Sequence, residues 1–343
     1  MMSDNRQISY KSGYFIIEFW KHKIERYSED STPRTIPSMA ALNTTVPFFL
    51  VEFYETTMKA ADQRTKDWPL IESPVATIVA VAGYFFIVWA GPKFMENRKP
   101  VHLGHLLTAY NFLLVALSSY MTYEFAMSAY LAGYGLGCQD VDYSWSPLAL
   151  RMASVCWVYY ISKFVEVLDT VFFILRKKNK QLTFLHVFHH GTMMFNWWLC
   201  VRFVPGGCSF FHALLNSFVH VIMYSYYGLS ALGPRVQPFL WWKRYVTRIQ
   251  VIQFVVVLIH SLYVTLFCDF NKFLSGLASA YAIIMIVLFS NYYYQQFVRS
   301  MKAKQRAAKP DPQTKLPMIN NNHSYSIQSV TEARKRIPGP VSA

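Results

Sequence analysis

The sequence predicts an all-α membrane protein built from a bundle of seven transmembrane helices. Of its 343 residues, 53% are hydrophobic and 15% are charged, so the chain is more apolar than a typical soluble domain. The apolar residues gather in seven stretches, each close to or above the roughly 20 residues that cross about 30 Å of hydrocarbon. Basic residues concentrate in alternate connections between these stretches. Composition, stretch length and charge pattern together predict this fold class.

The apolar stretches are expected to form the transmembrane helices in chain order. They span residues 74–89, 106–131, 147–175, 182–203, 210–232, 245–267 and 273–298. We therefore predict a helical domain over 74–299, preceded by an N-terminal arm, 1–73, and followed by a tail, 300–343.

The basic residues predict the orientation, because Lys and Arg in short loops are retained on the cytoplasmic side. The connections after the first, third and fifth stretches are basic, with Lys93, Arg176 and Arg235 among their residues, whereas 132–146 and 205–209 contain neither Lys nor Arg. The N-terminus is thus predicted to be lumenal and the C-terminus cytosolic. The net charge of +14 then indicates orientation and contact with anionic surfaces, not nucleic-acid binding.

The two flanking segments carry weaker signals. The lumenal arm is expected to be partly disordered or interfacial, and Asn43 begins a glycosylation sequon within it. The polar, basic tail is expected to be disordered and cytosolic. Cys138, Cys208 and Cys268 lie on or near lumenal loops. The sequence alone is compatible with one disulfide among these three cysteines and with free thiols throughout.

Polar side chains lie within five of the predicted helices at a similar depth. At 1.5 Å per residue they occupy a slab roughly 10 to 20 Å below the cytosolic surface, and their three- and four-residue spacing gives each helix one polar stripe. The members are Asn111, Lys163, Glu166, Asp169, Thr170, His189, Asn216, His220, Tyr224, Tyr227, Gln250 and Gln253. Polar groups in hydrocarbon must turn inward and pair, so we expect a polar cavity that opens to the cytosol. Two structural alternatives are also possible. Lys163 could form an ion pair that only stabilises the bundle, and the glutamines could form hydrogen bonds between helices.

Three imidazoles come from the motif His-Val-Phe-His-His. His186, His189 and His190 are at i, i+3 and i+4, which places the rings on one helical face within reach of a shared substrate or metal. With Asp169 or His220 they could ligate zinc or iron. Membrane lipid desaturases and hydroxylases use similar boxes, but they need several, and one occurs here.

Two further interpretations need no metal. Seven helices with an outside N-terminus suit a receptor or transporter, but a receptor's pocket opens outward, whereas these residues cluster near the cytosol. Alternatively, a sheltered neutral imidazole can attack a thioester and form an acyl-imidazole. The basic loops suit a polyanionic carrier such as coenzyme A, and the apolar interior suits an acyl chain.

Four motifs, taken together, resemble the very-long-chain fatty acid elongases, the membrane 3-oxoacyl-CoA synthases. They begin at Lys163 (Lys-Phe-Val-Glu-Val-Leu-Asp-Thr), at His186, at His220 (His-Val-Ile-Met-Tyr-Ser-Tyr-Tyr) and at Thr247 (Thr-Arg-Ile-Gln-Val-Ile-Gln). The resemblance covers about 74–299. It implies a cytosol-open catalytic cavity joined to a tunnel for the acyl chain, inside a helical bundle or barrel.

The resemblance also implies a reaction and roles. A long-chain acyl-CoA and malonyl-CoA would condense with loss of carbon dioxide to give a 3-oxoacyl-CoA two carbons longer, with no bound cofactor and no metal. His189 would carry the acyl group, and His220 would contact the reacting carbonyl. The remaining residues expected at the catalytic and substrate sites are His186, His190, Asn216, Lys163, Glu166, Asp169, Tyr224, Tyr227, Gln250 and Gln253.

The surroundings of this site follow from charge and from the resemblance. Location and charge favour Arg176, Lys243, Arg244 and Arg299 as contacts for the coenzyme A head. The resemblance implies a disulfide between Cys138 and Cys268, residence in the endoplasmic reticulum membrane, a homodimer, and the reductases and dehydratase of the elongation cycle as partners.

Overall fold

The computed structural model describes residues 48–299, 301 and 302, and these are helical, with no strand among them. The all-α prediction is therefore confirmed. The α-helices are α2 (Phe48–Lys59), α3 (Pro74–Met95), α4 (Gly104–Leu131), α5 (Pro147–Glu166), α6 (Leu168–Leu175), α7 (Phe184–Phe203), α8 (Ser209–Ala231), α9 (Lys243–Phe267) and α10 (Lys272–Tyr293). Short 3-10 helices lie between them at Gln63–Thr65, Asn179–Gln181 and Gln237–Phe239, and a π-helical turn, Tyr294–Arg299, continues α10. The described residues up to Phe297 belong to one compact unit, and those from Val298 onward belong to another.

Every predicted apolar stretch is helical, but the third is divided. Helix α5 ends at Glu166 and α6 begins at Leu168, while Val167 between them keeps a right-handed conformation with φ −58° and ψ −26°. The Thr170 N–H donates to the Val167 carbonyl at 3.0 Å, an i to i+3 bond that tightens the chain there. Eight helices, α3 to α10, therefore occupy the seven stretches within the described part of the chain.

Three helical segments are long and apolar enough to cross a membrane: α3, α9, and α10 together with the helical turn that continues it to Arg299. Others carry the polar side chains of the predicted slab, such as Lys163 and Glu166 on α5, which lower their mean hydropathy. The described chain thus has the helices of a multi-pass membrane protein.

Helix α3 has one face packed against the bundle and one exposed apolar face. Ser73 caps it, accepting a hydrogen bond from the Val75 N–H at 3.3 Å, and Pro74 occupies the first turn, where a missing N–H costs nothing. The helix packs against α6 and α7 on one side. Val79 and Phe86 on its other side are more than 60% exposed, an apolar surface that suits hydrocarbon better than water.

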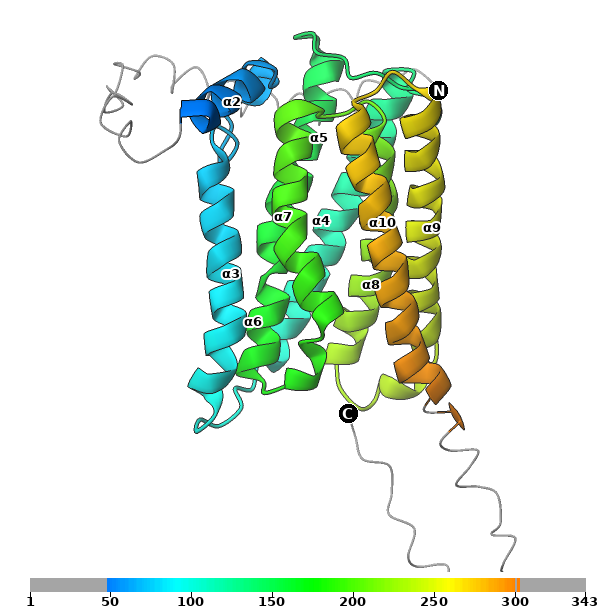
Figure 1. The fold of residues 1–343 in the computed structure, drawn as a ribbon. Helices are drawn as coiled ribbons and strands as arrows, with labels where there is room; N and C mark the ends of the chain where they lie inside the picture. The colour runs from blue at the N-terminus through cyan, green and yellow to red at the C-terminus, as the bar shows by residue number, and fades with distance from the viewer. Residues whose placement is uncertain (1–47, 300, 303–343) are drawn as a thin grey trace, which may run out of the picture. The chain divides into compact units, whose positions relative to one another are not determined.

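The core lies where α4, α5, α7 and α8 meet (Figure 1). Phe125, Tyr159, Trp197 and Phe210 are buried there, with the Tyr159 and Trp197 ring centroids 4.3 Å apart. The predicted polar side chains lie toward the basic loops, in the last turns of α5, the first turns of α7 and the middle and second half of α8.

A buried ion-pair network lies at the other end of α7 and is named the Asp62 clamp, comprising Asp62, Arg64 and Arg202. The Arg64 guanidinium donates two bonds of 3.1 Å and one of 2.6 Å to the Asp62 carboxylate. Arg202 donates to the Asp62 carbonyl at 2.6 Å, and the Asp62 N–H donates back to the Arg202 carbonyl at 2.8 Å. The clamp ties the segment before α3 to the last turn of α7.

Candidate active site

Glu166, the last residue of α5, is the centre of the predicted polar site. Its Oε1 atom lies 2.7 Å from Lys163 Nζ and 3.2 Å from Ser162 Oγ, both one turn earlier on α5. His220 of α8 brings its Nδ1 atom within 3.5 Å of the same oxygen. Lys163 and Glu166 are each 2% exposed. Two predicted motifs therefore meet at one buried carboxylate.

The histidine motif occupies the first turns of α7. Thr183 caps this helix by accepting from the His186 N–H, as expected for a threonine ahead of an apolar helix. The ring centroids of His186 and His190 are 4.4 Å apart, and those of His189 and His190 are 5.5 Å apart. The predicted single face is confirmed, and all three rings are half-buried.

Each of two histidines reaches a hydroxyl on another helix. His186 Nε2 lies 2.8 Å from Thr170 Oγ1 of α6, and His189 Nδ1 lies 3.1 Å from Tyr281 OH of α10. His189 is also within electrostatic range of Lys163, His220 and Glu166. The structure thus brings the α7 histidines and the α5–α8 cluster into one polar neighbourhood.

Tyr159, Thr192 and Tyr281 belong to this neighbourhood but are absent from the predicted site. The Tyr159 hydroxyl donates to Asn216 Oδ1, and its ring lies 4.0 Å from Lys163 Nζ. Tyr159 precedes Lys163 by four residues, so helical spacing could have identified it. Tyr281 is surrounded in sequence by apolar and small residues of α10 and carries no such signal.

Asp169 lies in a second polar group. Its Oδ2 atom accepts a hydrogen bond of 2.9 Å from Tyr224 OH, and Tyr224 contacts the rings of His220 and Tyr227 edge-on. Asp169 is paired with this tyrosine, so its predicted influence on the imidazoles stays a prediction. Tyr227 is 41% exposed.

The two glutamines of α9 differ in their surroundings. Gln250 is half-buried and donates to Met223 Sδ of α8 at 3.3 Å, which is the interhelical bonding considered above as an alternative. Gln253 is buried at 4% exposure.

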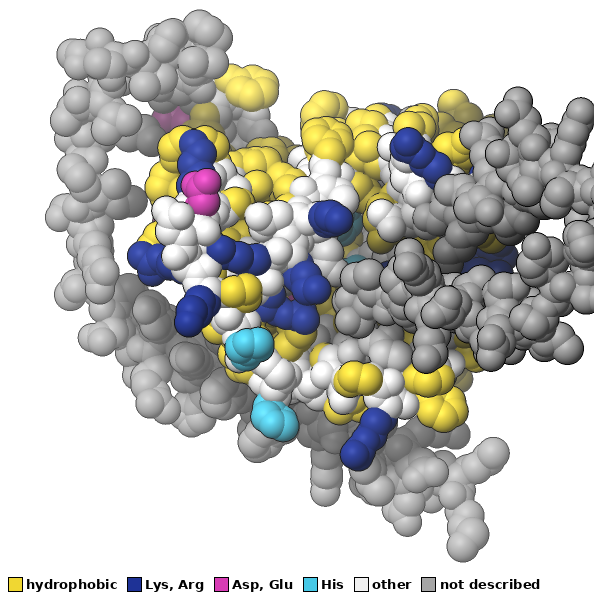
Figure 2. Space-filling model, turned by 90° about the horizontal axis from the view of Figure 1, so that it is seen from below, with side chains coloured by type: hydrophobic (Ala, Val, Ile, Leu, Met, Phe, Trp, Pro, Cys, Tyr) yellow, Lys and Arg dark blue, Asp and Glu magenta, His cyan; other side chains and the backbone are white. Residues whose placement is uncertain are grey.

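Three of the predicted carrier contacts, Arg176, Lys243 and Arg244, lie at the end of the bundle that bears the basic loops. Arg176 ends α6 and is half-buried, while Lys243 and Arg244 begin α9 and are exposed. Arg299 ends the turn Tyr294–Arg299 and belongs to the separate unit that starts at Val298. Figure 2 shows this end with many Lys and Arg side chains and little acidic surface. The face therefore suits a polyanion.

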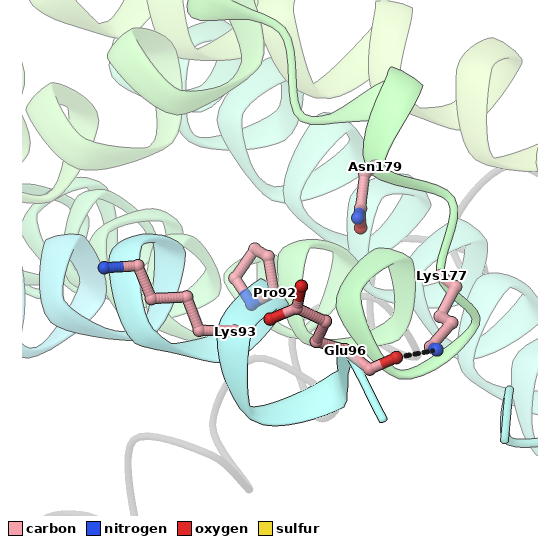
Figure 3. A pocket seen from close by; sticks show the side chains of 5 residues that line it. All are labelled: Pro92, Lys93, Glu96, Lys177 and Asn179. Atoms are coloured by element: carbon pink, nitrogen blue, oxygen red, sulfur yellow. Dashed lines mark hydrogen bonds between the residues drawn. The ribbon is translucent and has the colours of Figure 1, made fainter. Parts of the chain in front are cut away.

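One pocket of about 410 Å³ opens at this end, lined by Pro92, Lys93, Glu96, Lys177 and Asn179 (Figure 3). Lys177 Nζ donates to the Glu96 carbonyl at 2.8 Å. Lys93 points away from the pocket, with its Nζ atom 4.4 Å from the Trp89 ring centroid. None of the five lining residues is a predicted site residue, so this pocket is distinct from the polar cavity expected around the histidines.

The remaining site predictions concern modifications and metals. Cys138 and Cys268 form a disulfide, which is the pair that the resemblance implies, and Cys208 is free. Asn43 lies outside the described residues. Among the residues that the structure describes, no group of three or more His, Cys, Asp or Glu side chains has an arrangement that could hold a metal ion.

Comparison with known proteins places the whole helical region in one family. The profile of the GNS1/SUR4 (ELO) family matches residues 69–305. The chain is 47% identical over 257 residues to "Very long chain fatty acid elongase 7" of Rattus norvegicus, covering 74% of this chain and 91% of the rat protein. It is 48% identical over 280 residues to "Very long chain fatty acid elongase 4" of Homo sapiens, covering 80% and 87%. It is also 48% identical over 257 residues to human "Very long chain fatty acid elongase 1", covering 74% and 92%. The chain therefore belongs to the very long chain fatty acid elongase family, ELO or GNS1/SUR4.

Proposed function

We propose that this protein is a 3-oxoacyl-CoA synthase that lengthens a long-chain acyl-CoA by two carbons at the expense of malonyl-CoA. Family membership supports fatty acid elongation as the overall process. The observation that carries the chemistry is that His189, the buried Lys163–Glu166 pair and His220 converge from three helices. Such a group offers a nucleophile with charged and hydrogen-bonding neighbours, which is what covalent acyl transfer requires.

In the first stage, a neutral His189 attacks the thioester carbonyl. A carbon–nitrogen bond forms, the carbon–sulfur bond breaks, and coenzyme A leaves as a thiolate that takes a proton from solvent. The acylated ring carries a positive charge while it keeps its second N–H. The Glu166 carboxylate acts in favour of that charge, and its ion-pair partner Lys163 acts against it.

In the second stage, malonyl-CoA loses carbon dioxide and its electron pair becomes an enolate. The enolate carbon attacks the acyl carbon, the carbon–nitrogen bond breaks, and His189 returns to its neutral form. His190, Asn216, His220 and Tyr224 are the proposed donors that position the enolate and the carbonyl oxygen. Neither stage calls for a metal or a bound cofactor.

The proposed setting follows from the charge pattern and the family. Seven helical stretches would span the endoplasmic reticulum membrane, with the N-terminus lumenal and the C-terminus cytosolic. Arg176, Lys243, Arg244 and Arg299 would meet the coenzyme A head, and the acyl tail would point toward the lumenal side through the bundle. The protein would act as a homodimer alongside the reductases and dehydratase of the cycle.

The test is to incubate purified protein with a radiolabelled long-chain acyl-CoA and no malonyl-CoA, and then to map the adduct by mass spectrometry. We expect release of coenzyme A and an acyl group on His189. His189→Ala should abolish both, whereas His105→Ala, an exposed histidine at the start of α4, should not. If elongation proceeds with malonyl-CoA while no adduct or early release appears, direct condensation replaces the acyl-imidazole scheme.

A further inference from the structure

Tyr159 of α5 forms a hydrogen bond to Asn216 of α8 beside the candidate site. Its hydroxyl donates to Asn216 Oδ1, and the two side chains are buried, at 1% and 7% exposure. Lys163 follows Tyr159 by four residues and His220 follows Asn216 by four, so each partner shares a helical face with a member of the site. The bond therefore joins α5 and α8 next to the group formed by Lys163, Glu166 and His220.

The direction of this bond fixes the orientation of the Asn216 amide. An asparagine side chain has a carbonyl oxygen, which accepts hydrogen bonds, and an NH2 group, which donates them. In the structure the Asn216 oxygen accepts from Tyr159. Because the amide is planar, holding its oxygen at the tyrosine turns its nitrogen, Nδ2, away from the tyrosine.

The Asn216 NH2 group has no acceptor within the described part of the chain. The bond from Tyr159 is the only side-chain hydrogen bond that Asn216 makes with the described residues. A buried donor without an acceptor costs stability, so such groups are rare in folded proteins and often have a functional role. The Asn216 amide is therefore suited to donate to an oxygen of a bound molecule.

The reaction proposed above creates oxygens of that kind. When a nucleophile attacks a thioester, the carbonyl oxygen gains negative charge. When malonyl-CoA loses carbon dioxide, the charge of the resulting enolate lies largely on its thioester oxygen. An amide N–H that already points at such an oxygen stabilises it without rearrangement, as asparagine side chains do in oxyanion holes.

We propose that Tyr159 is a positioning residue for Asn216: by donating to Oδ1, it holds the amide nitrogen toward the substrate as a donor to the thioester oxygen that gains negative charge. This inference rests on the function proposed above. It adds a residue that was absent from the predicted site and that acts through Asn216. Neither side chain gains or loses a proton in the reaction.

The ring of Tyr159 is held independently of its hydroxyl. Its centroid lies 4.3 Å from that of Trp197 and 6.2 Å from that of Phe125, and Lys163 Nζ lies 4.0 Å from it. None of these contacts involves the hydroxyl. Tyr159→Phe should therefore keep the ring in place and free the Asn216 amide to rotate by half a turn, which would set Oδ1 against the substrate oxygen.

The inference is tested with four variants of the full-length protein: Tyr159→Phe, Asn216→Ala, the two combined, and Tyr160→Phe as the matched control. Tyr160 is the next residue of α5 and is also buried, and its hydroxyl lies 2.7 Å from Thr77 Oγ1 of α3 and donates to the Leu70 carbonyl at 3.2 Å. The readouts are the maximal rate of 3-oxoacyl-CoA formation and the acyl-CoA and malonyl-CoA concentrations that give half that rate.

We expect Tyr159→Phe to lower the maximal rate by roughly 10- to 100-fold, as is typical when a partner that orients an active-site group is removed. The half-maximal concentrations should stay unchanged, because the lost interaction belongs to the transition state. Asn216→Ala removes the donor itself and should lower the rate by about 100- to 1,000-fold. The combined variant should be no slower than Asn216→Ala, and Tyr160→Phe should elongate like the wild type.

Two partial reactions identify the oxygen that the amide serves. Release of coenzyme A from acyl-CoA without malonyl-CoA reports on the acyl thioester. Release of labelled carbon dioxide from malonyl-CoA in the presence of acyl-CoA reports on the enolate. Tyr159→Phe and Asn216→Ala should slow the same partial reaction, and slowing of different ones would overturn the inference.

Three further results would overturn it while leaving the proposed function intact. The first is a wild-type rate for Asn216→Ala, and the second is equal rates for Tyr159→Phe and Tyr160→Phe. The third is a combined variant in which the two losses multiply, since independent effects behave in that way. A wild-type protein that forms no 3-oxoacyl-CoA would instead overturn the proposed function and this inference with it.

Discussion

Two buried acid–base pairs, Asp62–Arg64 and Lys163–Glu166, are nearly identical in length and burial but differ in their surroundings. The nitrogen–oxygen distances are 2.6 and 2.7 Å, and all four side chains are 2% exposed. At the Asp62 clamp, the carboxylate accepts from the Arg64 guanidinium and from the Arg64 backbone N–H at 2.8 Å. The acceptor groups of that carboxylate are fully used.

Glu166 is used differently. Its Oε1 atom is shared among Lys163, Ser162 and His220, while Oε2 is buried and makes no hydrogen bond within the described residues. A buried acceptor without a partner costs stability unless it serves another purpose. The first pair thus belongs to a clamp that ties two segments together, whereas the second includes an acceptor atom that no described residue uses.

Breaking the Asp62 clamp should give the largest effect on stability. Asp62→Asn leaves the Arg64 guanidinium buried without its counter-charge, and we expect the free energy of unfolding to fall by about 3–5 kcal/mol. Thermal unfolding in detergent measures the loss. Asp67→Asn, the same change at an exposed site in the same segment, is the control and should unfold like the wild type. If Asp62→Asn and Asp67→Asn unfolded at the same temperature, the clamp would not contribute to stability.

Replacing the Lys163–Glu166 pair as a unit should separate stability from chemistry. Lys163→Met with Glu166→Gln removes both charges, and such replacements are often neutral for stability. We expect the rate of His189 acylation to fall on the order of 10- to 100-fold, because the groups that surround the imidazoles are lost. The control is Glu124→Gln with Arg151→Met, which removes a partly buried pair of 2.8 Å between α4 and α5 away from the site. If the Lys163–Glu166 double variant acylated His189 at the wild-type rate, the pair would have only a structural role, like that of the clamp.

The sequence predicted the helical class, the positions of the helices and the shared face of the three histidines. These features follow from local periodicity, since apolar runs and i, i+3, i+4 spacing are properties of one helix at a time. The break at Val167 escaped prediction because neither Gly nor Pro, the residues that usually interrupt a helix, occurs near it.

Contacts between helices were less predictable. The Asp169 carboxylate, for example, accepts a hydrogen bond from Tyr224 of α8, a partner that spacing along one helix does not predict. Tyr281 was missed because an isolated tyrosine in an apolar helix gives no sequence signal until the fold brings it to His189. The Asp62 clamp joins residues that lie 140 positions apart, and a distance of that kind depends on tertiary packing.

The smallest effect is expected beside the Asp62 clamp, where the Arg64 guanidinium donates to the Asp142 carbonyl and the Asp142 side chain is exposed in the loop between α4 and α5. Hydrogen bonds from Ser144, first through its side chain and also through its backbone N–H at 2.9 Å, hold the pKa of the Asp142 carboxyl below its ordinary value of 3.8. A lowered pKa in the folded state means that the ionised form stabilises the fold. That contribution is present above pH 3.8 and is lost as the pH falls through the lowered pKa.

Asp142→Asn should therefore lower the free energy of unfolding by less than about 1 kcal/mol at pH 7, as exposed charge interactions do. In acid, the difference in stability from the wild type should vanish. Unfolding temperatures measured from pH 7 down to about pH 2, through the lowered pKa, provide the check. If the unfolding temperatures of the wild type and the variant differed by a constant amount across that range, the loop would depend on the shape of the Asp142 side chain and not on its charge. The charge interactions that stabilise this region would then be those of the buried clamp residues alone.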